Sequence, residues 1–295
     1  MTRKTRAEGV LLALTLIWGS TFVVGKIVLV AVTPLQMIAA RFTLATMFLL
    51  AFFSRRIFPL TRRQILRGGV LGVFLFAGFV AQTVGLTMTT ASKSAFITGM
   101  MVVFVPLLQV VIERRAPRIG NLAGVVVVTA GLWLLTSPAG AAPGTGDILT
   151  LVCAVLFAVY IVYIDLVAHE MSALQLTFIQ MASNAVFAVA ASAAFDTLPA
   201  HVPSGTVVAL LYLTIFATLV TTFMQTRYQK ETSPTRAAVI FTIEPVVAAV
   251  IAAIVLGEQI GIMGAAGGGL IIGGVLLSEL SDGIPFLNRS FGPAR

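Results

Sequence analysis

Ten long apolar segments, bounded by glycine, proline or charged residues, follow one another along this chain. Their lengths match the roughly 20 residues that an α-helix needs to cross the hydrocarbon core of a bilayer. The segments are continuously apolar rather than alternating, which disfavours membrane-spanning strands. They lie at about 9–32, 35–53, 68–89, 94–112, 120–136, 147–168, 173–195, 205–228, 234–256 and 261–280, and the fifth is the shortest. We therefore predict an all-α polytopic membrane protein with ten transmembrane helices.

The composition agrees with this prediction. Of the 295 residues, 58% are hydrophobic and 10% are charged, whereas soluble domains are about 45–50% apolar and about 25% charged. So few charged residues cannot cover the surface of a soluble protein of this size. Ten helices of roughly 20 residues also leave fewer than about a hundred residues for loops. A soluble enzyme and an attached ATPase or sensor domain are therefore excluded.

The basic residues are distributed very unequally between the two sides of the membrane that ten spans define. One side, which also holds both termini, carries sixteen of the nineteen Lys and Arg residues. These sixteen are Arg3, Lys4, Arg6, Arg55, Arg56, Arg62, Arg63, Arg67, Arg114, Arg115, Arg118, Arg227, Lys230, Arg236, Arg289 and Arg295. Lys26 and Lys93 fall near the outer ends of their helices, where we expect them to snorkel. By the positive-inside rule both termini are predicted to be cytoplasmic, so the net charge of +8 does not call for nucleic acid.

The chain also resembles itself at an offset of about 139 residues. The matches are Trp18-Gly19 with Phe157-Ala158, Thr33-Pro-Leu-Gln36 with Ser172-Ala-Leu-Gln175, Pro106 with Pro245, and, after a four-residue slip, Gly124 and Gly131 with Gly267 and Gly274. Their shared order predicts two five-helix repeats, at 1–140 and 141–283, and a cytoplasmic tail at 284–295. Because five is odd, the second repeat must enter the membrane from the opposite side. Such inverted repeats are typical of secondary transporters, which bind substrate near the midplane.

Four short motifs carry a resemblance to a known family. They are Trp18-Gly-Ser-Thr-Phe22, Arg41-Phe42, Ile243-Glu-Pro-Val-Val247 and Leu256-Gly-Glu258. Over about residues 9–280 the chain resembles the drug/metabolite transporter superfamily, specifically the EamA-type carriers, which consist of two tandem EamA repeats. Within that group it is most similar to bacterial YddG-type exporters of amino acids and related metabolites. Arg114-Arg115 stands where the second half has Gly257-Glu258, which argues against an essential role for Glu258.

Two charged residues fall deep inside predicted spans. Glu244 lies ten residues into the ninth span, or ~15 Å by the helical rise, near the midplane. It could carry a coupling proton or bind a substrate amine; alternatively, it caps the disruption made by Pro245 or pairs with Arg41. Arg41 lies seven residues into the second span, ~10 Å deep. It could contact a substrate carboxylate, but we favour an ion pair with Glu244 or a contact with a helix end.

Pro106 and Pro245 occupy matching positions in the fourth and ninth spans. Each removes a backbone hydrogen bond and should kink its helix. Paired kinks suggest hinges that bend around a central cavity, although simple packing kinks are the alternative.

Uncharged polar and large apolar side chains at mid-depth are the candidates for substrate contact. The polar candidates are Gln82, Gln180, Asn184 and Thr242. Gln180 and Asn184 share a helix face, and such amides point to a cavity or to another helix. The candidates for an apolar wall are Trp18, Phe79, Met100, Met101, Phe157 and Tyr160, for which ordinary packing is the alternative.

The sequence contains no pattern that indicates an enzyme. HExxH and GxSxG are absent, Cys153 is the single cysteine, and His169 and His201 fall on opposite sides of the membrane. We expect no metal, no cofactor and no nucleic-acid partner.

The predicted function is a secondary transporter that exports small metabolites, with amino acids favoured, across a bacterial inner membrane by alternating access. Its expected partners are the small-molecule substrate, the lipid bilayer and protons, and we expect a monomer, with a homodimer as the alternative. A drug exporter and a sugar or nucleotide-sugar carrier are the competing functions. A phosphate-bearing substrate calls for several buried cations, and the predicted spans offer only Arg41.

Overall fold

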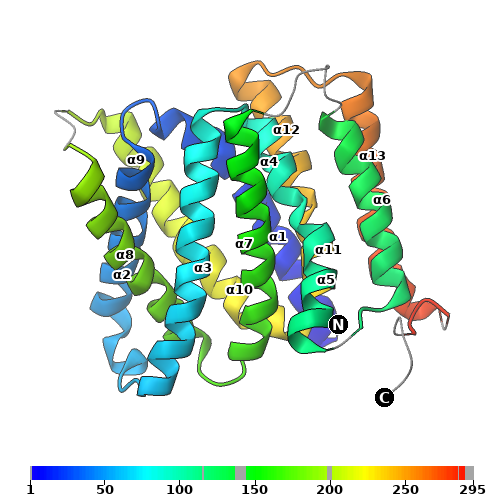
Figure 1. The fold of residues 1–295 in the computed structure, drawn as a ribbon, viewed down its shortest axis with the longest axis horizontal. Helices are drawn as coiled ribbons and strands as arrows, with labels where there is room; N and C mark the ends of the chain where they lie inside the picture. The colour runs from blue at the N-terminus through cyan, green and yellow to red at the C-terminus, as the bar shows by residue number, and fades with distance from the viewer. Residues whose placement is uncertain (1, 115, 137–143, 198–200, 285, 290–295) are drawn as a thin grey trace.

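The computed structural model describes residues 2–114, 116–136, 144–197, 201–284 and 286–289, and no β-strand occurs in these ranges. The helices run between an upper and a lower face of the molecule (Figure 1). Helices α1 to α8 are α1 (Arg3–Val28), α2 (Pro34–Ile57), α3 (Arg62–Thr87), α4 (Ala91–Gly99), α5 (Met101–Glu113), α6 (Ile119–Thr136), α7 (Thr145–Val167) and α8 (Ala173–Phe195). The remaining helices are α9 (Ser204–Thr214), η1 (Ile215–Val220), α10 (Thr221–Tyr228), η2 (Gln229–Glu231), α11 (Pro234–Phe241), α12 (Ile243–Leu256), α13 (Ile262–Leu280) and η3 (Ser281–Gly283).

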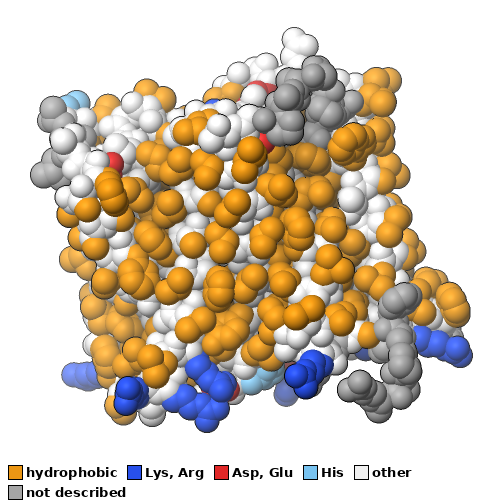
Figure 2. Space-filling model, in the orientation of Figure 1, with side chains coloured by type: hydrophobic (Ala, Val, Ile, Leu, Met, Phe, Trp, Pro, Cys, Tyr) orange, Lys and Arg blue, Asp and Glu red, His pale blue; other side chains and the backbone are white. Residues whose placement is uncertain are grey.

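This arrangement is that of a multi-pass membrane protein. Within the described ranges, nine helical segments are long and apolar enough to cross a membrane, and α6 is a shorter apolar helix. Hydrophobic side chains cover the flank of the molecule, while Lys and Arg gather along its lower edge (Figure 2). The predicted all-α fold is confirmed, and each of the ten predicted segments coincides with a helix or with helices that join end to end. Of the sixteen basic residues predicted on one side, Arg115 and Arg295 lie outside the described residues.

Three of the spans are interrupted. The ninth breaks at Thr242, so Pro245 lies in the first turn of α12, where the missing N–H costs no helical hydrogen bond. The fourth breaks at Met100, and Pro106 lies inside α5, six residues further along the chain. The two interrupted spans meet at this level, because a Cβ added to Gly99 would lie 2.9 Å from Cγ of Pro245. The interruption of the eighth span by the π-helix η1 was not predicted.

Two helices begin with the matching motifs found in the sequence. Thr33 and Gln36 form a capping box at the start of α2, and Ser172 and Gln175 form another at the start of α8. Each glutamine also bonds a carbonyl at the C-terminal end of the other helix: Gln36 Nε2 donates to the Thr197 carbonyl (2.6 Å), and Gln175 Nε2 donates to the Ile57 carbonyl (3.1 Å). The two motifs thus make matching contacts at opposite faces of the molecule.

Helices α6 and α13 pack through the glycines that the repeat comparison aligned. A Cβ added to Gly131 would lie 2.7 Å from the carbonyl oxygen of Gly267, and one added to Gly274 would lie 3.1 Å from that of Gly124. By contrast, a Cβ on Gly269 would meet nothing within 4 Å. Close backbone approach therefore uses the glycines that match between the repeats.

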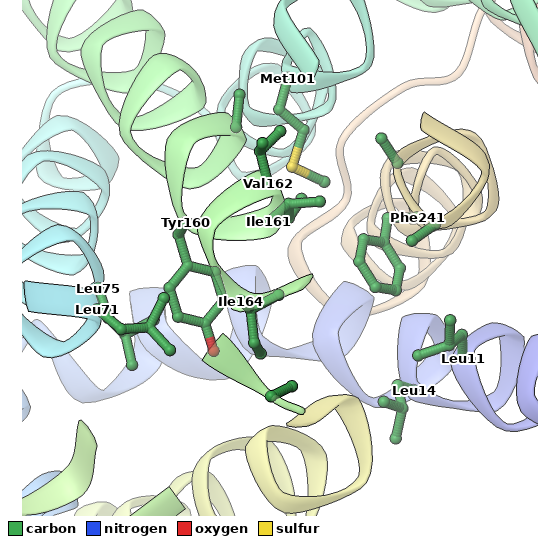
Figure 3. Packing of buried hydrophobic residues seen from close by; sticks show 14 of the residues in the cluster. Leu11, Leu14, Leu71, Leu75, Met101, Tyr160, Ile161, Val162, Ile164 and Phe241 are labelled. Atoms are coloured by element: carbon green, nitrogen blue, oxygen red, sulfur yellow. The ribbon is translucent and has the colours of Figure 1, made fainter. Parts of the chain in front are cut away.

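Helix α7 packs against α3 and α5 and exposes apolar side chains such as Ile148 and Val152 on its other face. In Figure 3, Tyr160 of α7 lies beside Leu75 of α3, while Ile161 lies on the side of Met101 and Phe241. All five side chains belong to one hydrophobic cluster of buried residues or pack against it. The buried face of α7, with its neighbours, forms part of the wall of the cavity described next.

Candidate functional site

A cavity that is partly open to solvent lies between helices that come from both ends of the chain. Predicted site residues on its wall are Trp18, Arg41, Phe79, Gln82, Met101, Phe157, Tyr160 and Glu244. The cavity is also lined by residues that were not predicted, namely Thr21, Leu75, Thr98, Ile161, Ala217, Thr222, Gln225 and Phe241. A central cavity between helices is the usual position of a ligand site in helical bundles and transporters.

Aromatic rings form two sides of this cavity. Trp18 and Phe241 meet edge to face, with ring centroids 5.2 Å apart. Phe79 and Phe157 do the same at 5.6 Å. Such pairs fix the ring orientations and present flat apolar surfaces of the kind that bind an aromatic or aliphatic group.

Arg41 enters the cavity from α2 and is held by the π-helix. Its Nε donates to Oγ1 of Thr218 (3.0 Å), and Thr218 in turn donates to the carbonyl of Leu213, five residues earlier (2.8 Å). The guanidinium carbon lies 5.0 Å from the centroid of the Phe79 ring, which adds a cation–π contact. Within the described residues, the guanidinium makes no other hydrogen bond, so its remaining N–H groups are available to a ligand.

Glu244 lines the cavity from the first turn of α12 and is 8% exposed. The ion pair favoured between Arg41 and Glu244 is not formed, because no nitrogen–oxygen pair of the two approaches within 4.0 Å in the described structure. The hydrogen bonds and ion pairs of the described residues likewise give this carboxylate no partner. A buried carboxylate without a partner is expensive unless it binds a proton or a ligand cation.

Four of the predicted substrate-contact residues lie away from the cavity wall. Oε1 of Gln180 accepts a hydrogen bond from the hydroxyl of Tyr160 (2.7 Å), so Gln180 positions a residue that lines the cavity. Asn184 donates to the carbonyl of Gly72 (3.2 Å) and ties α8 to α3. Met100 and Thr242 mark the breaks of the fourth and ninth spans. For Gln180 and Asn184 the helix-to-helix alternative describes the contacts observed.

The unpredicted wall residues differ in how far the sequence could have indicated them. Thr98, Thr222 and Gln225 are polar residues within spans, which is the same signal that identified Gln82. Thr218 is different, because its contact with Arg41 depends on the π-helical turn. The sequence offers no comparable signal for that turn.

A profile of the EamA-like transporter family matches the chain twice, over residues 6–137 and 144–280. The chain belongs to the EamA-like transporter family. It is therefore a membrane transporter, and the family predicted from the four motifs is confirmed at this level.

The relatives of this EamA transporter bear transporter names. Two proteins of Archaeoglobus fulgidus, both called "Uncharacterized transporter", are 33% and 31% identical to it; the alignments cover 82% and 91% of this chain and 76% and 96% of the relatives. The "Uncharacterized inner membrane transporter YedA" of Escherichia coli K12 is 27% identical, with 85% of this chain and 83% of YedA covered. One crystal structure has a TM-score of 0.78 over 94% of this chain and 97% of its own, at 17% identity, which shows a shared fold.

Proposed function

We propose that this EamA transporter exports small metabolites, amino acids first among them, across the bacterial inner membrane. One observation carries the proposal: Arg41 and Glu244 both line the cavity, yet they are not paired with each other. An α-amino acid offers a carboxylate to the first, an ammonium group to the second, and a side chain to the aromatic walls. Charge-assisted hydrogen bonds of this kind are among the strongest in proteins.

Alternating access around the cavity is the proposed mechanism, with residues 1–140 and 141–283 as two inverted repeats. Support comes from the two family matches and from the matching capping boxes at opposite faces. Helix α1 begins at the lower face and α7 at the upper face, as inverted repeats require (Figure 1). The basic lower edge in Figure 2 supports a cytoplasmic position for this face and for both termini. The inner-membrane name of YedA supports the location.

Export of organic cations, as in a drug exporter, is the second candidate. The observation in its favour is the carboxylate of Glu244 beside aromatic rings, an arrangement that also binds ammonium groups. A sugar-phosphate or nucleotide-sugar substrate is less well matched, because Arg41 is the one cationic side chain on the described cavity wall.

Counterflow into proteoliposomes tests the proposal. Liposomes loaded with unlabelled phenylalanine should accumulate labelled phenylalanine, and empty liposomes should not. Phenethylamine lacks the carboxylate and 3-phenylpropionate lacks the amine, so neither should compete well. Equal competition by phenethylamine would favour the organic-cation candidate, while the absence of counterflow with every amino acid in a panel would refute amino-acid export.

A further inference from the structure

Several ion pairs of the described residues connect the two repeats, among them those of Arg63 and Arg67 with Glu170. Two others occupy equivalent positions, one at each face of the molecule. At the upper face, Nζ of Lys93 in α4 lies 2.7 Å from Oδ2 of Asp147 in α7. At the lower face, Nε of Arg236 in α11 lies 3.0 Å from Oε1 of Glu8 in α1. Each pair takes its base from the fourth span of one repeat and its acid from the first span of the other. Lys93, expected to snorkel, is thus paired.

The two pairs occupy equivalent positions in the repeats. Asp147 follows Glu8 by 139 residues, which is the offset of the first aligned motifs. Arg236 follows Lys93 by 143 residues, which is also the separation of Thr90 and Ser233, the residues that cap the N-termini of α4 and α11. A threonine completes each group. Thr89 donates to Oδ1 of Asp147 (3.0 Å), and Thr232, 143 residues later, donates to Oε1 of Glu8 (3.2 Å).

We call Thr89, Lys93 and Asp147 the upper triad, and Thr232, Arg236 and Glu8 the lower triad. In both triads, the acid and the base are separated from a cavity-lining residue of the same helix by the same number of residues. On the acid-bearing helices, Trp18 follows Glu8 by ten residues and Phe157 follows Asp147 by ten, which is ~15 Å along a helix. On the base-bearing helices, Thr98 and Phe241 each follow the base by five residues, or ~7.5 Å. Each triad therefore joins two cavity-lining helices at the end nearer to one face.

The lower triad is the more deeply buried and the more extensively bonded of the two. The side chain of Arg236 is 2% exposed, and it also bonds the Glu279 carboxylate and the carbonyls of Ser278 and Glu279. Lys4 lies 3.7 Å from Glu8. In the upper triad, the side chain of Lys93 is 37% exposed. A pair of this kind is stable while both partners stay together, and water can solvate each charge when they separate.

We propose that the two triads are the gates of the transport cycle. The upper triad closes the upper face and the lower triad closes the lower face, and opening to either face separates the acid from the base of that triad alone. Both triads are formed in this structure, with the cavity between them. This assignment rests on the proposed alternating access, in which the repeats must part at one face at a time.

The test measures which face gives a reagent access to the cavity. A single cysteine replaces Thr21 on the cavity wall, in a chain whose native Cys153 has been changed to Ala. A membrane-impermeant maleimide is applied to one face at a time in vesicles of each orientation. Asp147→Asn should accelerate labelling from the upper face by about tenfold or more, which corresponds to a bias of about 1.4 kcal/mol or more, and leave the lower face unchanged. Glu8→Gln should do the reverse.

Glu231→Gln is the matched control. Glu231 also forms an ion pair at the lower face, but with Arg227, four residues away in the same span, so its loss should change labelling from neither face. The exchange of Lys93→Asp with Asp147→Lys should restore slow labelling, which a purely structural defect would not allow. Equal acceleration from both faces by either single variant, or no acceleration by both, would overturn the gate assignment. Labelling does not require a substrate, so a failure of amino-acid counterflow would count against the proposed function alone.

Discussion

Replacement of Arg41 by Gln should remove the carboxylate site and leave the rest of the cavity in place. The guanidinium uses Nε to hold Thr218, and its other N–H groups face the cavity. A hydrogen bond to a charged group contributes about 1.5–3 kcal/mol, so the affinity for an amino acid should fall by about 10–150-fold. Phenethylamine has no carboxylate, and its affinity should change by less than about threefold, within about 0.7 kcal/mol.

The assay is half-saturation of phenylalanine counterflow, together with the concentration of phenethylamine that inhibits this counterflow by half, measured with the same protein preparation. Thr218→Val is the informative companion variant, because it keeps the guanidinium but removes the hydroxyl that orients it. It should weaken phenylalanine binding by a smaller factor than Arg41→Gln. If Arg41→Gln lowered the affinities for both compounds equally, Arg41 would act by holding the fold, and the reasoning would be refuted.

Three further predictions concern other parts of the molecule. Glu244→Gln should abolish the dependence of transport on an imposed pH gradient in liposomes, because the residue can no longer take up a proton; an unchanged dependence would show that Glu244 is not the coupling site. Gly131→Ala places a Cβ 2.7 Å from the carbonyl oxygen of Gly267 and should cost about 1–3 kcal/mol, seen as a lower melting temperature in detergent, whereas Gly269→Ala points into open space and should change it little. Glu258→Ala should destabilise the fold by about 0.5–2 kcal/mol in the same melting assay, because its carboxylate accepts the N–H groups of Ala91 and Ser92 at the start of α4 (3.0 and 3.2 Å); an unchanged melting temperature would contradict a capping role.

The fold could be predicted from the sequence because a bilayer leaves a long apolar segment little choice but a helix. The capping boxes at Thr33 and Ser172 also follow from sequence, since a cap is a contact within four residues. Trp18 and Phe157 were placed on the same wall by their matching positions and depth.

The predictions that failed depended on the neighbours of a residue. Helical spacing shows that Gln180 and Asn184 share a face, but not that this face meets α3 and α10. Arg41 was expected to pair with Glu244, whereas its Nε donates a hydrogen bond to Thr218 of the π-helix. The break of the fourth span at Met100 was not predicted, because proline was the only signal used to locate an interruption and Pro106 lies six residues further along.

The central claim is that the cavity binds an amino acid, and Trp18 can report it directly. The chain has two tryptophans, and the other, Trp133 of α6, is 64% exposed and does not line the cavity. In a Trp133→Phe protein, the fluorescence of Trp18 should change saturably as phenylalanine is added, and Arg41→Gln should shift that titration to higher concentration. A Trp18 signal that responds to no amino acid, in protein that still melts cooperatively, would contradict the claim.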